Sequence, residues 1–346
     1  MANIGIIGAG SWGTALGILL VNNGHKTTLW SHRQEQAEEL DRTREHREKL
    51  PGVRLPEALE ITNDLEKTLV GKDILIMAVP SVAVRQTAKK IKPFIRYGQL
   101  IVNVAKGIEE GTLMTLTEII EEEIPEAVPC VLSGPSHAEE VSRGLPTTCV
   151  AGAKDRKTAE YIQNIFMSPV FRVYISPDVL GIELGGALKN VIALAAGAAD
   201  GLGYGDNTKA ALITRGISEI TRLGIAMGAK VETFYGLSGI GDLIVTCASK
   251  HSRNRRAGIL LGQGKTMEEA MKEVKMVVEG VYSAKAGWEL SQKYHVEMPI
   301  IQQVNQVLFE GKTPDLAVQD LMLRDKKIES WDVSWKQSRY TKYAGI

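Results

Sequence analysis

The sequence is poor in the residues that mark disulfide-rich, metal-binding and nucleic-acid-binding proteins. Its 346 residues include three scattered cysteines, Cys130, Cys149 and Cys247, with no Cys-x-x-Cys pair and no cysteine–histidine cluster. Neither a disulfide framework nor a metal site is therefore expected, and the thiols should be buried and reduced. Lysine plus arginine equals aspartate plus glutamate, at 41 each. The basic excess typical of a nucleic-acid-binding protein is thus missing.

Long uncharged apolar runs are also missing. No stretch approaches the roughly 18 residues needed to span a bilayer, and the richest, Val191–Ala199, is short and closely follows Lys189. The apolar segment Asn3–Ile7 has no basic residues before it and leads into glycines, which is typical of a first strand rather than a signal peptide. We therefore expect a cytoplasmic protein with no membrane span, and the length predicts two domains.

Short apolar segments alternate with helical ones in the first half of the chain. The expected strands are Asn3–Ile7, Thr27–Trp30, Ile74–Val79, Leu100–Val104 and Val131–Ser133, with Thr147–Ala151 and Phe171–Tyr174 as further candidates. Continuous apolar strands separated by helices predict a mostly parallel sheet covered on both faces. From Pro177-Asp178, a typical helix start, helical spacing predominates. We expect a Rossmann-type α/β domain at 1–178, an all-α domain at 179–328 and a polar tail at 329–346.

A glycine motif follows the first strand and opens a helix. Gly8, Gly10 and Gly13 form G-x-G-x-x-G, with Ser11 and Trp12 inside it. In this context the first glycine permits a tight turn, the second lets backbone N–H groups approach a pyrophosphate, and the third lets the helix pack against the sheet. The helix N-terminus stabilises the anion. The motif predicts a dinucleotide cofactor, although a glycine-rich turn without a ligand would have the same sequence.

The end of the second strand distinguishes the two nicotinamide cofactors. NAD-binding proteins usually place an acidic residue there for the ribose 2′-hydroxyl. Here Ser31, His32 and Arg33 stand at that place, and an arginine can hold a 2′-phosphate. The sequence therefore favours NADP(H) and leaves NAD(H) open; the alternative is a solvated arginine.

Two lysines are candidates for the chemistry. Lys106 follows a strand at the edge of the sheet where ligands bind, although a surface lysine would fit as well. Lys189 interrupts an apolar helical stretch, with Ile192 and Ala193 on its face. Burial there would lower the pKa of the amine, so that it could exchange a proton with an alcohol. The alternative is a lysine whose amine reaches solvent at the domain edge.

A third segment predicts an anion site. Arg253 offers a planar fork suited to phosphate oxygens, and Ser252 and Asn254 are further donors. If Ser252 caps the next helix, the free N–H groups of that helix add to the site. Asp242, shortly before, could pair with Lys189 or bind substrate hydroxyls. The alternative is a solvated basic helix start.

In combination, GAGSWGTAL, VNVAKGIE, VLSGPSHAEEV, ELGGALKNVIALAAG, GLSGIGDLIVTC and HSRN resemble the bacterial NAD(P)-dependent glycerol-3-phosphate dehydrogenases. The resemblance runs from the N-terminus to about Lys327. It implies that Lys189 is the general acid/base for the C2 hydroxyl. The substrate contacts that it implies are Lys106, Gly134, Ser136, Lys189, Asp242, Ser252, Arg253 and Asn254, with Arg253 and Asn254 on the phosphate. The cofactor contacts that it implies are Gly8, Gly10, Ser11, Trp12, Gly13, His32, Arg33, Lys106, Ala138, Arg253, Val277 and Glu279.

The implied activity is reversible hydride transfer between a nicotinamide and C2 of sn-glycerol 3-phosphate, giving dihydroxyacetone phosphate. The implied role is the supply of glycerol 3-phosphate for phospholipid synthesis. Two alternatives stay open: a 3-hydroxyacid dehydrogenase or ketopantoate-type reductase, which needs a carboxylate pocket, and a dinucleotide-binding sensor without catalysis. The sequence does not fix the oligomeric state, and a homodimer is compatible with it.

Overall fold

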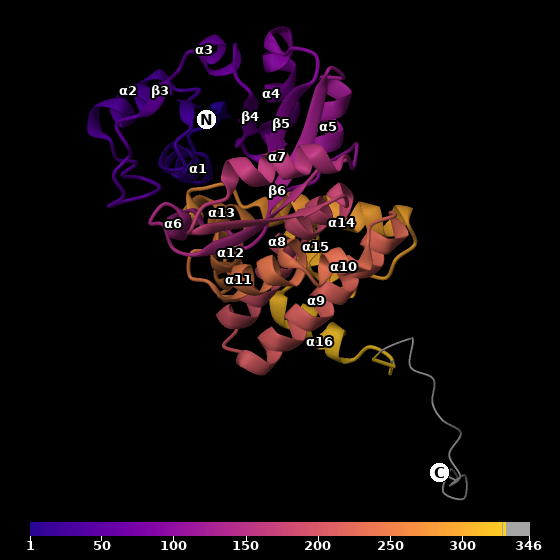
Figure 1. Cartoon of the computed structure of the whole chain (residues 1–346). Helices are drawn as coiled ribbons and strands as arrows, with labels where there is room; N and C mark the ends of the chain where they lie inside the picture. Colours follow the sequence, from indigo (N-terminus) through magenta and orange to yellow (C-terminus); the bar gives the residue numbers. More distant parts are fainter. Residues whose placement is uncertain (327, 330–346) are drawn as a thin grey trace, which may run out of the picture.

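The computed structural model describes residues 1–326, 328 and 329. The tail expected at 329–346 lies outside the described residues, except for Glu329. Figure 1 shows a half that contains the sheet lying against a half built of helices. The Rossmann-type first domain and the helical second domain are thereby confirmed.

In the part of the chain that the structure describes, eight strands form a single sheet of order β3-β2-β1-β4-β5-β6-β7-β8. The strands are β1 (Asn3–Ile7), β2 (Lys26–Trp30), β3 (Leu59–Thr62), β4 (Ile74–Met77), β5 (Gln99–Asn103), β6 (Ala127–Ser133), β7 (Thr147–Gly152) and β8 (Phe171–Ser176). Neighbouring strands are parallel except β6 and β7, which are antiparallel. The mostly parallel sheet is as expected, and β3 is a strand that the sequence analysis missed.

Helices cover both faces of this sheet. They are α1 (Ser11–Asn22), α2 (Gln34–Thr43), α3 (Leu65–Leu69), α4 (Val84–Ile91), α5 (Leu116–Glu123), α6 (Ala138–Val141) and α7 (Arg156–Phe166). Alternate residues of β4 enter different cores: Ile74 and Ile76 lie in the core with α1 and α7, whereas Leu75 and Met77 lie in the core with α4 and α5. A strand buried on both faces needs a continuous apolar sequence, which is why these strands lack polar alternation.

The second half is built around α8. Its helices are α8 (Val179–Gly201), α9 (Asp206–Ala226), α10 (Val231–Phe234), α11 (Asp242–Ala248), α12 (Arg253–Gly262), α13 (Met267–Val274), α14 (Glu279–Lys293), α15 (Pro299–Phe309) and α16 (Pro314–Met322). Asp178 caps α8, accepting a hydrogen bond from Gly181 N at 3.0 Å, so the helix starts where expected. Although α8 is long and apolar enough to cross a membrane, its most apolar window is 83% buried inside the protein, as in a core helix. Helix α8 is longer than the apolar run expected from the sequence, because it includes the charged residues Glu183 and Lys189, both of which are buried.

Helices α8 and α12 approach each other through glycines. A Cβ at Gly197 would lie 2.1 Å from the carbonyl oxygen of Arg255, and one at Gly258 would lie 2.1 Å from that of Leu194. No side chain fits such gaps, so the two backbones are in contact. This contact fixes the first turn of α12 against the middle of α8.

Candidate active site

The glycine-rich turn between β1 and α1 has two glycines that the fold requires and one that faces open space. Gly8 has φ +119°, and a Cβ on Gly13 would lie 2.0 Å from the Gly8 carbonyl oxygen. A Cβ on Gly10, by contrast, would meet nothing within 4 Å. No side chain caps α1, which begins at Ser11 and Trp12, so the N–H groups of its first turn are available to an anion. The turn therefore fits a dinucleotide pyrophosphate.

The end of β2 presents one free cation. Arg33 is exposed at the N-cap of α2, and its guanidinium makes no hydrogen bond or ion pair with the residues described. His32 beside it is also exposed. Ser31, next to them, is buried and donates a hydrogen bond to Gln36 Oε1 at 2.7 Å. Ser31 also accepts a hydrogen bond from Arg33 N at 3.3 Å and therefore helps to form the start of α2.

Lys49, which was not among the predicted site residues, lies near both Arg33 at the end of β2 and Arg253 in the helical half. Burial lowers the pKa of Lys49, and the charges of Arg33 and Arg253 lower it further, against the opposing effect of Glu48. Arg33 and Arg253, from distant segments, thus both lie close enough to Lys49 for their charges to repel its ammonium. Such repulsion is relieved by an anion, so this region suits the phosphates of a cofactor or substrate. The guanidinium of Arg253 has no partner among the described residues.

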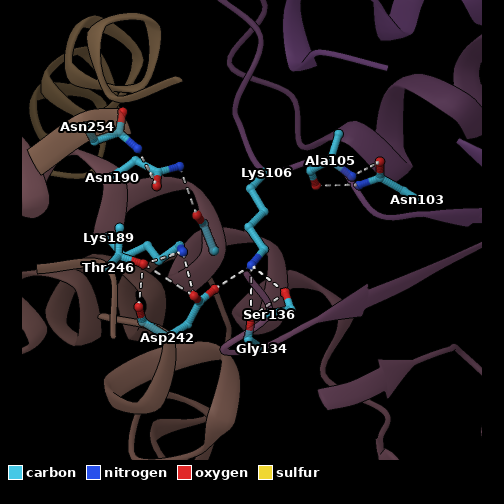
Figure 2. A network of polar contacts seen from close by, with 11 residues as sticks. Asn103, Ala105, Lys106, Gly134, Ser136, Lys189, Asn190, Asp242, Thr246 and Asn254 are labelled. Atoms are coloured by element: carbon cyan, nitrogen blue, oxygen red, sulfur yellow. Dashed lines mark hydrogen bonds and ion pairs between the residues drawn. The ribbon is translucent and has the colours of Figure 1, made fainter. Parts of the chain in front are cut away.

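A buried carboxylate between two lysines forms the centre of the site (Figure 2). Asp242, at the start of α11, accepts from Lys189 Nζ at 2.5 Å and from Lys106 Nζ at 2.6 Å. Lys189 also donates to Thr246 Oγ1 at 2.7 Å. Lys106 comes from the loop after β5, so its bond to Asp242 joins the two halves of the protein. The pairing of Asp242 with Lys189 is one of the two arrangements expected.

Burial sets the protonation chemistry of this cluster. It lowers the pKa of Lys189 to about 8, with Asp242 opposing the shift and Lys106 adding to it. Burial would raise the pKa of Asp242, but the two lysines outweigh it and the net pKa is lowered. At neutral pH the carboxylate is ionised and the Lys189 amine can both hold and release a proton. Of the two readings of Lys189, the buried amine is correct and the solvent-reaching one is wrong.

The loop after β6 lies against Lys106. Gly134, with φ +143°, offers its carbonyl oxygen to Lys106 Nζ at 2.9 Å. Ser136 Oγ donates to the same oxygen at 2.9 Å and lies 3.5 Å from Lys106 Nζ. Ala138 is buried at the start of α6. The structure thus gathers Lys106, Gly134 and Ser136 in one place, as the resemblance implies.

At the start of α12 the predicted helix cap is present, and Asn254 makes hydrogen bonds within the protein. Ser252 caps the helix, accepting from Arg255 N at 3.2 Å. Asn254 is engaged by the protein, since it donates to Asn190 Oδ1 at 2.9 Å and accepts from Gly280 N at 2.9 Å. Asn190 directly follows Lys189, so Asn254 ties the first turn of α12 to the helix that carries the buried amine (Figure 2).

Glu279, at the start of α14, reaches across to the other half. Its carboxylate accepts from the backbone N of Ser81 at 3.1 Å and from the Ser81 hydroxyl. Burial raises the pKa of Glu279, and the bonds from Ser81 oppose the shift. Val277 is half-buried just before α14. Glu279, an expected cofactor contact, thus itself makes a contact between the two halves.

A third contact between the halves supports Lys106. Asn103, the last residue of β5, donates to Glu183 Oε1 at 3.1 Å. It also donates to Ala105 O and accepts from Ala105 N, each at 3.1 Å (Figure 2). Glu183 on α8 also accepts from the backbone N of Thr117 at 3.1 Å and from its hydroxyl. The turn that carries Lys106 is therefore fastened to the helix that carries Lys189. Asn103 could have been recognised as a polar residue ending an apolar strand, whereas Thr246 and Ser81 carry no such signal.

Comparisons with known proteins agree over nearly the whole chain. Residues 3–159 match the model of the NAD-dependent glycerol-3-phosphate dehydrogenase N-terminus, and residues 178–319 match that of the C-terminus. The chain belongs to this family. The glycerol-3-phosphate dehydrogenase [NAD(P)+] of Agathobacter rectalis is 64% identical over 97% of this chain and 100% of its own length. That of Fusobacterium nucleatum is 62% identical over 96% and 100%. The chain is thus an NAD(P)-dependent oxidoreductase of the glycerol-3-phosphate dehydrogenase family, and the non-catalytic sensor is set aside.

Solved structures give the same result. A glycerol-3-phosphate dehydrogenase from Coxiella burnetii has a TM-score of 0.90 and 38% identity, covering 93% of this chain and 99% of its own. A ketopantoate reductase from Ralstonia eutropha has a TM-score of 0.60 at 15% identity, covering 92% and 99%. The second likeness concerns the fold alone. It explains why a ketopantoate-type reductase could be considered from architecture, while the family assignment favours a phosphorylated substrate.

The described residues contain no group of histidine, cysteine or acidic side chains that could hold a metal ion. The three cysteines are buried and unpaired, as expected. Burial raises the pKa of each of these thiols to about 12, so they are poor nucleophiles.

Proposed function

We propose that this dehydrogenase interconverts sn-glycerol 3-phosphate and dihydroxyacetone phosphate, with Lys189 as general acid/base. The observation that carries this proposal is the buried amine of Lys189 held by Asp242 beside Lys106. A reduced nicotinamide supplies the hydride that the C2 carbonyl carbon accepts. As the carbonyl oxygen gains negative charge, the Lys189 ammonium donates its proton to that oxygen; in the reverse direction the neutral amine removes the hydroxyl proton.

Asp242 and Lys106 prepare Lys189 for this task. Asp242 holds the amine in one position and stabilises its charged form. Lys106 adds positive charge next to the substrate, and this charge stabilises the alkoxide that develops at C2. The backbone of Gly134 and the hydroxyl of Ser136 hold Lys106 in place and line the same substrate site.

The remaining contacts divide between cofactor and phosphate. We assign Gly8, Gly10, Ser11, Trp12, Gly13, His32, Arg33, Lys106, Ala138, Arg253, Val277 and Glu279 to the dinucleotide. The free guanidinium of Arg33 favours NADP(H) over NAD(H), since it can pair with a 2′-phosphate. Arg253 and the capped turn that begins at Ser252 bind the substrate phosphate. Asn254 acts mainly by positioning this turn against Asn190.

The cellular location and metabolic role follow from the proposed activity. We propose a cytoplasmic enzyme that supplies glycerol 3-phosphate for phospholipid synthesis. The dinucleotide-binding domain occupies 1–178 and the substrate domain 179–328, because β8 ends at Ser176 and α8 begins at Val179.

A steady-state assay with the purified enzyme tests the function. Dihydroxyacetone phosphate is supplied with NADPH or NADH, and a branched 2-ketoacid with NADPH serves as the comparison. We expect turnover of the phosphorylated ketone and a higher kcat/KM with NADPH. Turnover of the ketoacid alone would reject the proposal in favour of a ketopantoate-type reductase.

A further inference from the structure

His137 carries a buried nitrogen without a hydrogen-bond partner. Its Nε2 atom is shielded from solvent and bonded to nothing among the described residues. Buried polar atoms are nearly always paired, and leaving one unpaired costs stability. An unpaired imidazole nitrogen next to an active site therefore suggests that a ligand completes its hydrogen bonding.

The surroundings of His137 place it within the site. It follows Ser136, and its carbonyl oxygen accepts from Glu140 N at 3.1 Å and Val141 N at 3.0 Å, so its backbone is fixed. The charges of Lys189, Lys106 and Asp242 all act on its imidazole. The ring also lies 5.9 Å from that of His251, centroid to centroid, at an angle of 56°.

The position of His251 indicates that His137 lies near the start of α12. It stands directly before Ser252 and Arg253, which form the anion-binding start of α12. His137 therefore lies near both the lysine–aspartate cluster, where we place the reacting C2 oxygen, and the start of α12, where we place the phosphate. It comes from the opposite half of the protein to Arg253, so the two can approach one phosphate group from different sides.

The charge state of His137 fits a neutral donor. Burial lowers the pKa of its imidazole, Lys189 and Lys106 lower it further, and Glu139 and Asp242 oppose them. A neutral imidazole has one N–H, and a hydrogen bond from it to a phosphate oxygen is charge-assisted.

We propose that His137 donates a hydrogen bond from Nε2 to the phosphate of the substrate and so distinguishes phosphorylated from unphosphorylated ketones. This assignment rests on the proposed function. It gives the unpaired nitrogen a partner only when substrate is bound. It also makes His137 a substrate-binding residue from the sheet half, additional to those implied by the family resemblance.

Three variants test this role: His137→Leu removes the donor, His137→Gln keeps one, and His251→Leu removes the neighbouring ring. For each, kcat and KM are measured with dihydroxyacetone phosphate and with dihydroxyacetone, and NADPH binding confirms the fold. We expect His137→Leu to lower kcat/KM for the phosphorylated ketone by about 10- to 100-fold, mainly through KM. Dihydroxyacetone should be unaffected, and His137→Gln should recover most of the loss.

Different results would contradict the proposed His137 contact and the proposed function. An equal loss on both ketones, no loss on either, or the same loss in His251→Leu would each overturn the proposed contact. If His137→Leu fails to bind NADPH, His137→Phe, which keeps the ring volume without a donor, takes its place. Absence of turnover by the unmodified enzyme would reject the proposed function, whereas normal turnover with unaffected His137 variants would reject only this contact.

Discussion

The reactivity of Lys189 depends on its surroundings more than on its type. Its position among apolar residues was visible in the sequence, and this was enough to predict a lowered pKa. The sequence could not show that Lys106 and Thr246 also reach the cluster, because Lys106 and Asp242 are 136 positions apart. Likewise, the sequence could not show that the Asn254 side chain donates to Asn190 and accepts from Gly280 N; its contact with the phosphate stays a prediction.

Replacing Lys189 with methionine should abolish catalysis and leave the fold intact. Methionine has a similar length but no proton to give, so we expect kcat to fall by about 10²- to 10⁴-fold. NADPH binding, measured by fluorescence titration, should persist. Lys157→Met, on the exposed side of α7, is the matched control and should keep full activity. If Lys189→Met retains more than a tenth of the activity, Lys189 is not the acid/base.

Replacing Arg33 with alanine should weaken NADPH more than NADH. Only NADPH carries the 2′-phosphate, and losing a charge-assisted contact costs roughly 1.5–3 kcal/mol, or about 10- to 100-fold in Kd. Arg42→Ala, an exposed arginine on the same helix α2, is the control and should change neither Kd. Equal weakening of both cofactors by Arg33→Ala would remove the basis for the NADP(H) preference.

Helices and strands could be predicted where a continuous sequence pattern marks them. They could not be predicted where pairing between distant segments determines them. The strands of the central sheet and the start of α8 were predictable because apolar runs and the Pro177-Asp178 pair mark them. Strand β3 was missed because it is four residues long and includes Glu60. The antiparallel direction of β7 against β6 was also beyond the sequence, since it depends on how the connection crosses the sheet edge.

The contact between α8 and α12 should control substrate binding. Gly197→Ala places a methyl group against the Arg255 carbonyl oxygen, so α12 must move and its first turn moves with it. Overpacking of this kind costs about 1–3 kcal/mol of unfolding free energy, and we expect KM for dihydroxyacetone phosphate to rise. Denaturant unfolding and steady-state kinetics measure the two effects. Gly205→Ala, where a Cβ meets nothing within 4 Å, should change little; equal effects in both variants would contradict this explanation.

At the scale of the whole molecule, the two halves are joined by polar contacts at the site itself. Lys106 with Asp242, Asn103 with Glu183, and Ser81 with Glu279 all link the sheet half to the helical half. In the proposed mechanism, catalysis and association of the halves therefore depend on the same groups. This coupling could not be predicted from either half of the sequence alone.

Buried carboxylates should make stability depend on pH. Burial raises the pKa of Glu183 to about 7, against hydrogen bonds from Thr117, Thr115 and Asn103. Between the unfolded pKa of about 4.3 and this value the folded state holds a proton that the unfolded state lacks. The unfolding free energy should consequently fall as pH rises through this window, by up to about 4 kcal/mol from this group.

Urea unfolding at pH 5, 6, 7 and 8 measures this dependence. Glu183→Gln removes the titrating group and should flatten the decline relative to the unmodified enzyme. Glu121→Gln, a half-exposed carboxylate on α5, is the control and should keep the original slope. An unchanged slope in Glu183→Gln would show that Glu183 does not hold a proton in the folded state.

The most direct test of the central claim, that a buried Lys189 amine donates the proton, is the pH dependence of kcat in both directions. Reduction needs the protonated amine, so its kcat should be constant at lower pH and fall about tenfold per unit above pH 8. Oxidation needs the neutral amine, so its kcat should rise through the same pH. A reduction rate that stays constant up to pH 10 would contradict the assignment of Lys189 as the proton donor.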